Sequence, residues 1–242
     1  MRTPMSLRLG VTAAVVAFMV ALGAAPAGAA TDAASATVDS FHTQLETEAA
    51  SSSLAAVELK KFEKLSASDQ QKLVDYLSDP EITAAFENTA QTGESVSVEN
   101  GDVEMSVDVD RTSAPISASS ALKTRSATTA AAGATYNVTA KYDVEQRILG
   151  VLITKLSQTF KYVTGNGVVV RTSSCVAAAV NFNVAVQLDS SVSHYMLSGG
   201  KAECDVVWHG YIAFKGLGVQ IDKTQSMVVN GPGVVSRTLR NA

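Results

Sequence analysis

Three histidines are the side chains of this sequence best suited to acid–base chemistry: His42, His194 and His209. In a serine hydrolase, a histidine accepts the proton of a serine nucleophile while a carboxylate orients the imidazole. Ser193 precedes His194, and Asp205 lies between His194 and His209 in the sequence. The G-x-S-x-G turn that presents the nucleophile in many hydrolases does not occur here. A secreted hydrolase using His209 or His194 therefore stays an alternative, and no catalytic residue is assigned.

The sequence lacks the usual signatures of metal and phosphate sites. There is no H-E-x-x-H segment and no paired-cysteine motif, and the G-x-G pairs all read as turns between strands. Four carboxylates alternate along one expected strand, but same-face neighbours on a strand lie about 7 Å apart, which is poor spacing for one calcium ion. These four are Asp102, Glu104, Asp108 and Asp110. We expect them to form a solvated strand face, and we expect no metal and no cofactor.

A binding surface is the more concrete hypothesis. The segment 208–211 gathers the only tryptophan, a histidine and a tyrosine, and Lys215 follows. In a strand, successive side chains point to opposite faces, so Trp208 is predicted to enter the core while His209, Tyr211 and Lys215 face outward. An exposed aromatic ring with polar neighbours is suited to stacking on a sugar or meeting a protein partner. The alternative is that His209 and Tyr211 are merely solvated.

Residues 135–242 must form the frame that positions this segment. Apolar and polar residues alternate there through six to eight stretches separated by turns, typical of an antiparallel sandwich. Cys175 and Cys204 are the only cysteines. An even count in an exported chain predicts one disulfide between them, with free thiols or an intermolecular bond as alternatives.

The residues before this domain show first the apolar spacing of helices and then the alternation of strands. Apolar residues at helical spacing predict short packed helices over about residues 39–88, with start signals at Ser66 and at Asp79-Pro80. Alternation then predicts a β-hairpin over residues 96–109, turned at Asn100-Gly101. The predicted fold class is therefore α+β: short helices and a hairpin, a linker, and an all-β antiparallel sandwich with one disulfide.

Composition and charge divide the chain at residues 112–134, which are mostly Ser, Ala and Thr. Such a stretch buries too little apolar surface to offset the entropy of ordering it, so we predict a flexible linker. Residues 31–134 carry a net charge of −10 and residues 135–242 carry +4. An acidic pro-region over residues 30–111 that shields a basic, active C-terminal domain is therefore a further alternative. The +4 forms no basic run, so nucleic acid is not an expected partner.

The first 29 residues read as a secretory signal peptide of the bacterial type. Arg2 and Arg8 precede an uncharged apolar run over residues 11–22, and Ala27-Gly28-Ala29 forms an A-x-A cleavage site. The run is shorter than the roughly 20 residues that span a bilayer. The sequence therefore predicts a secreted, extracellular, soluble, non-enzymatic binding protein. Its expected partner is an extracellular protein or a cell-wall glycan, met through the β domain.

Overall fold

The computed structural model describes residues 36–116, 134–184, 186–214 and 217–242. The predicted signal peptide, most of the predicted linker and Lys215 lie outside these ranges. Among the described residues, no helix is both long enough and apolar enough to cross a membrane.

Four helices open the described chain, and polar side chains determine where each begins. They are α1 (Val38–Ala49), α2 (Ser53–Glu63), α3 (Ala67–Leu77) and α4 (Pro80–Thr92). Thr37, Ser52, Ser66 and Asp79 each accept a hydrogen bond from a backbone amide of the following turn, which satisfies a donor that has no partner inside the helix. The start signals predicted at Ser66 and at Asp79-Pro80 are confirmed.

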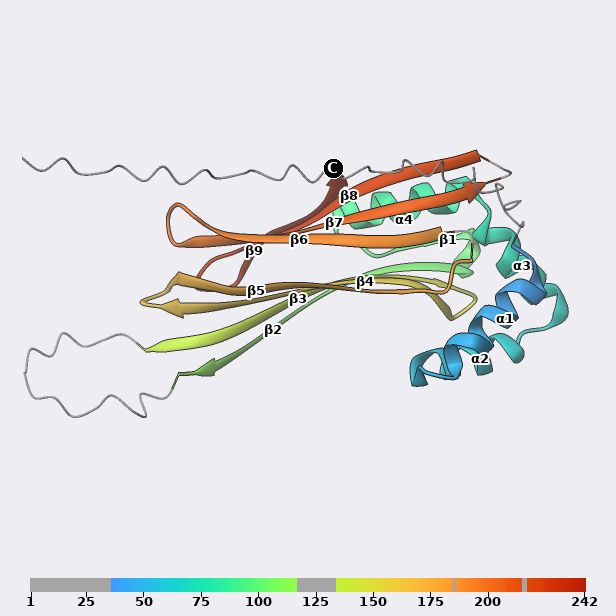
Figure 1. Cartoon of the computed structure of the whole chain (residues 1–242), viewed down its shortest axis with the longest axis horizontal. Helices are drawn as coiled ribbons and strands as arrows, with labels where there is room; N and C mark the ends of the chain where they lie inside the picture. The colour runs from blue at the N-terminus through green and yellow to red at the C-terminus, as the bar shows by residue number, and fades with distance from the viewer. Residues whose placement is uncertain (1–35, 117–133, 185, 215–216) are drawn as a thin grey trace, which may run out of the picture. The chain divides into compact units, whose positions relative to one another are not determined.

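The strands form two antiparallel sheets, as predicted. The five-stranded sheet has the order β1 (Val96–Val98), β2 (Val103–Pro115), β3 (Thr135–Ile148), β4 (Val151–Gly165) and β5 (Val168–Asn181). The four-stranded sheet has the order β6 (Val186–Leu197), β7 (Lys201–Phe214), β8 (Leu217–Val229) and β9 (Val234–Asn241). We call them sheet A and sheet B. Figure 1 shows them as two facing layers with α4 beside them.

The predicted hairpin is present, with a longer connection than a two-residue turn. β1 pairs with β2, and residues Glu99–Gly101 form one turn of 3₁₀ helix between them. Glu99, Asn100 and Gly101 all have positive φ angles. Asparagine and glycine adopt that conformation at low cost, which explains why Asn100-Gly101 marks the turn in the sequence.

Strand β2 continues beyond the hairpin and pairs with β3 along its whole length, from Val103 opposite Ile148 to Pro115 opposite Tyr136. Residues 112–115 therefore belong to a strand and not to the linker predicted to begin at residue 112. The cause is backbone pairing: side chains from Asp110 to Pro115 are exposed, so no apolar alternation records this part of the strand. The predicted acidic and basic regions thus contribute neighbouring strands to one sheet.

Two hydrophobic cores hold the described residues 36–242 together. The first lies between the sheets and includes Tyr142, Phe160 and Trp208. The second joins the helices to the β3–β4 hairpin and includes Phe41, Phe62, Ile148 and Leu152 as well as apolar side chains from α3 and α4. Since burying a large apolar side chain contributes about 1.5–3 kcal/mol, the helices are bound to the sheets by a substantial apolar contact.

The disulfide is confirmed and it crosses the sandwich. Cys175 on β5 of sheet A is bonded to Cys204 on β7 of sheet B, with their Cα atoms 5.7 Å apart. On the opposite side of the sandwich, α4 contacts both β2 and β9. The two sheets are therefore joined covalently on one side and bridged by a helix on the other.

Candidate functional site

The alternation predicted for β7 is observed. Trp208 is only 3% exposed and belongs to the inter-sheet core, whereas Tyr211 is 49% exposed. His209 lies on the same outer side as Tyr211 and is partly exposed. Strand geometry thus brings two of the three predicted binding residues to the outer face of sheet B.

A shallow depression of about 310 Å³ lies around these two residues. Two rows of side chains run across β6, β7 and β8 here, and all of their members except Asp222 line the depression. In one row Tyr211 pairs with Gln187 and Gln220, and in the other His209 pairs with Asp189 and Asp222. The register of three neighbouring strands therefore places an exposed aromatic ring next to two amides, a histidine and two carboxylates.

The histidine of this depression is held by its neighbour. His209 Nδ1 lies 3.0 Å from Asp222 Oδ1, and Gln220 donates hydrogen bonds of 3.2 and 3.1 Å to the two oxygens of Asp222. The hydrogen bond with His209 is the largest cause that lowers the pKa of the Asp222 carboxyl below its usual value, and the hydrogen bonds from Gln220 lower it further. On the other side, Asp189 Oδ1 accepts a hydrogen bond of 2.7 Å from the amide of Ser190. The row is therefore ordered, with a carboxylate that stays ionised at neutral pH.

The other two histidines lie elsewhere. His194 on β6 pairs with Cys204, and its ring centroid is 6.4 Å from that of Phe160. His42 on α1 lies between Glu46 and Glu63, with nitrogen–oxygen distances of 3.5 and 3.6 Å. The structure does not bring the three histidines together. His209 and Asp222 have the arrangement of the base and the orienting carboxylate of a hydrolytic triad, but in the described part of the chain no hydrogen bond joins His209 to a hydroxyl group.

Sequence reasoning missed a pair of glutamines that fix Trp208. Gln158 on β4 and Gln225 on β8 are both fully buried between the sheets. Trp208 Nε1 donates a hydrogen bond of 2.7 Å to Gln225 Oε1, and Gln225 Nε2 donates one of 3.1 Å to the carbonyl of Tyr142. Gln158 donates to the carbonyls of Cys204 and Gln225, at 2.6 and 3.1 Å. Buried polar groups need such partners, so this network orients the strand that carries His209 and Tyr211.

One sequence signal was available for these glutamines. Gln158 shares the parity of Leu156 and Phe160, which face the core, and Gln225 shares that of Met227. A glutamine at a core-facing strand position indicates a buried amide. Its partners lie on other strands, however, and cannot be found from the spacing along one strand.

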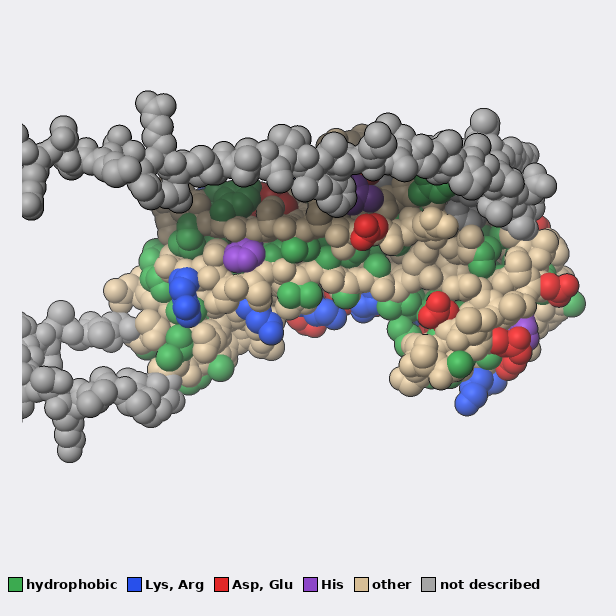
Figure 2. Space-filling model, in the orientation of Figure 1, with side chains coloured by type: hydrophobic (Ala, Val, Ile, Leu, Met, Phe, Trp, Pro, Cys, Tyr) green, Lys and Arg blue, Asp and Glu red, His purple; other side chains and the backbone are tan. Residues whose placement is uncertain are grey.

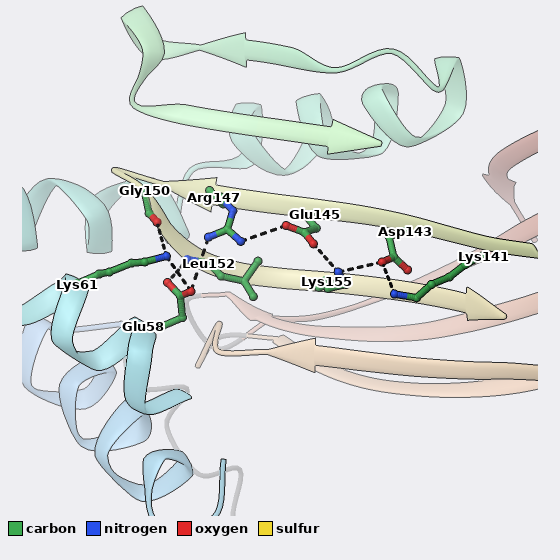
Figure 3. Close-up of polar contacts among 9 residues, drawn as sticks. All are labelled: Glu58, Lys61, Lys141, Asp143, Glu145, Arg147, Gly150, Leu152 and Lys155. Carbon is green, nitrogen blue, oxygen red and sulfur yellow. Dashed lines mark hydrogen bonds and ion pairs between the residues drawn. The ribbon is translucent and has the colours of Figure 1, made fainter. Parts of the chain in front are cut away.

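A second polar cluster lies on the outer face of sheet A, where charges of alternating sign connect β3 and β4 to α2 (Figure 3). We call it the charge ladder. In order along the ladder, its members are Lys141, Asp143, Lys155, Glu145, Arg147, Glu58 and Lys61. Buried Glu58 also accepts a hydrogen bond of 2.9 Å from the amide of Leu152. Because each charge has an internal partner, we interpret the ladder as structural.

Two carboxyl groups of the ladder have lowered pKa values. Burial raises the pKa of Asp143, but the hydrogen bonds from Lys141 and Lys155 outweigh that effect. Burial likewise raises the pKa of Glu145, and Lys155 and Arg147 together lower it further than burial raises it. Of the four carboxylates expected to share a solvated strand face, Glu104, Asp108 and Asp110 are exposed on β2, whereas Asp102 precedes the strand and pairs with Lys72. Within the described ranges, no group of three or more metal-ligating side chains is close enough to hold an ion.

Comparison with known proteins gives no relative: no family model, no curated protein and no solved structure matches this chain. The functional argument therefore depends on the site alone.

Proposed function

We propose that this chain is an exported, non-enzymatic binding protein whose ligand is a glycan of the cell wall, held on the outer face of sheet B. The observation that carries the proposal is the exposed ring of Tyr211 between Gln187 and Gln220. A tyrosine supplies a large contact area at a low cost in side-chain entropy, and sugar rings present flat apolar faces to such a surface.

The polar groups around Tyr211 support a polyhydroxylated ligand. Amides and carboxylates accept and donate hydrogen bonds in the directions that sugar hydroxyls offer. One carboxylate, that of Asp189, lines the depression, and a second, that of Asp222, is bonded to His209 beside it. Those charges disfavour a polyanion such as a nucleic acid. On the face drawn in Figure 2, apolar side chains of the described residues are interspersed among polar and charged ones.

Export is part of the proposal. It is supported by the signal-peptide pattern in the first 29 residues and by the disulfide, since disulfides persist in oxidising compartments. The precursor alternative finds less support. Removing residues 30–111 would strip β1, most of β2 and all four helices from cores that they share with the rest of the chain.

The experiment is co-sedimentation of the purified, exported form of the chain with insoluble peptidoglycan and with chitin. We expect the native protein to sediment with at least one of these glycans and Tyr211→Ala to lose most of that binding. Tyr195→Ala is the matched control. Tyr195 is similarly exposed, at 44%, on the same face, yet it lies outside the depression.

Two results would contradict the proposal. Equal losses for Tyr195→Ala and Tyr211→Ala would show that the depression is not the site. Release of soluble sugar from the glycan by the native protein, abolished in His209→Ala, would favour the hydrolase alternative.

A further inference from the structure

A cavity lies between helices α3 and α4 and the facing ends of the two sheets, on the opposite side of β7 from the depression. Its volume is about 100 Å³. Apolar side chains from five strands, α3 and α4 form most of its described lining, among them Phe86, Ile148, Leu156, Trp208 and Leu239. This cavity is separate from the proposed glycan surface, although Leu188 and Gly210 border both.

Gly210 helps to explain why the space is not filled. It occupies a buried, inward-facing position on β7, two residues after Trp208, and pairs with Leu188 on β6. Glycine inside a strand weakens it and often marks a place where a ligand approaches the backbone closely. Protein interiors otherwise close such gaps, because unfilled space forfeits van der Waals contacts.

One cation borders this apolar space. Lys223 on β8 pairs with Trp208 across the strands and lines the cavity, and its ammonium donates a hydrogen bond to the side chain of Asn241 on β9. An apolar interior bordered by an ammonium is complementary to a molecule with an apolar tail and an anionic head.

We propose that the cavity binds a small carboxylic acid, with its apolar tail against Trp208 and Phe86 and its carboxylate at Lys223. The volume limits the tail. An engineered apolar cavity of about 150 Å³ stays dry and binds benzene, so a cavity of about 100 Å³ is suited to a narrower group such as a short alkyl chain. This second site is independent of the glycan proposal, because its lining faces the interior of the sandwich.

The chain contains its own reporter for the test, since Trp208 is the only tryptophan. We would titrate the disulfide-bonded protein with sodium hexanoate and follow tryptophan emission, with 1-hexanol as the neutral ligand of matched chain length. We expect saturable changes with both ligands and tighter binding of hexanoate. Lys223→Gln should weaken hexanoate at least tenfold and leave hexanol unchanged. Lys201→Gln, which removes an exposed lysine of β7 outside the cavity, should match the native protein.

A cavity-filling variant tests the location. Gly210→Val adds an inward β-branched side chain, and we expect it to abolish binding of both ligands while thermal unfolding stays cooperative. If Gly210→Val does not fold, the comparison of hexanoate with hexanol in Lys223→Gln still tests whether the carboxylate binds at Lys223. No saturable emission change with either ligand would overturn the proposal. Hexanoate affinity unaffected by Lys223→Gln would overturn the assignment of the carboxylate.

Discussion

Trp208 and Tyr211 are three residues apart on one strand, and their side chains have opposite tasks. The indole is buried and donates to Gln225, whereas the phenol is half exposed in the depression. We therefore expect substitution of Trp208 to affect stability and substitution of Tyr211 to affect binding.

Trp208→Ala should destabilise the protein by about 3–5 kcal/mol, because it removes a buried aromatic side chain and leaves a cavity. Tyr211→Ala should change the free energy of unfolding by no more than about 0.5 kcal/mol, as exposed substitutions usually do. Chemical denaturation with fitted unfolding free energies measures both, with circular dichroism as the probe because Trp208→Ala removes the only tryptophan. A Tyr211→Ala loss as large as that of Trp208→Ala would mean that the ring is buried.

At this site the direction of a side chain could be predicted from the sequence, but its partners on other strands could not. The outward direction of Tyr211 followed from alternation along β7. The partner of His209 did not, because Asp222 lies on β8 and meets it only through the strand register. Lys215, the third predicted binding residue, lies outside the described ranges, so its role stays a prediction.

At the scale of elements, the charge ladder couples α2 to β3 and β4. Its two carboxyls with lowered pKa, those of Asp143 and Glu145, stabilise the folded state while ionised. A carboxyl whose pKa is lower in the folded state contributes stability above its ordinary pKa and loses it as the pH falls through the folded value. The relevant window therefore begins at the ordinary values of 3.8 and 4.5 and extends to more acidic pH.

We expect Lys155→Met to remove part of this acid dependence, because Lys155 bonds to both carboxyls, at 2.9 Å to Asp143 and 2.5 Å to Glu145. Melting temperature measured from pH 7 to pH 2 should fall less steeply below about pH 4.5 in this variant than in the native protein. Lys161→Met is the control, since Lys161 is an exposed lysine of the same strand outside the ladder. Identical acid profiles for the native protein and Lys155→Met would refute the coupling.

The extent of β2 determines where trypsin should cut first and whether the resulting fragments should stay together. Arg111 pairs with Ala140 in sheet A and donates a hydrogen bond of 3.2 Å to the carbonyl of Gly231. We therefore expect limited trypsin to cut at Lys123 or Arg125 before it cuts at Arg111. The two fragments should remain together in gel filtration, because β2 and β3 are neighbours and the helices share a core with the β3–β4 hairpin. Fragments that separate without denaturant would show that the two regions are independent.

The helices were more predictable than the extent of β2, and the reason is physical. Caps and apolar periodicity are local, so Ser66 and Asp79-Pro80 fixed helix starts from a few neighbouring residues. The far end of β2 is held by backbone bonds to a strand more than twenty residues later, and exposed side chains carry no trace of that pairing. Residues 112–115 were therefore predicted as linker, although long-range pairing makes them part of β2.

At the scale of the whole molecule, the disulfide joins the two sheets that carry the proposed sites. It closes a loop with a sequence separation of 29 residues. The chain-entropy estimate for such a loop is about 3–4 kcal/mol. Cys175→Ala with Cys204→Ala should lower the melting temperature by several degrees relative to the native protein. An unchanged melting temperature under non-reducing conditions would show that the covalent link contributes nothing to stability.

The central claim is that the ligand lies at His209 and Tyr211, and the three histidines allow a direct measurement. Heteronuclear NMR of the imidazole rings gives one set of signals for each of His42, His194 and His209. On titration with a soluble N-acetylglucosamine oligosaccharide, we predict that the His209 signals shift saturably while those of His42 and His194 stay in place. Saturable shifts of His194 or His42 with His209 unchanged would place the ligand elsewhere and contradict the account.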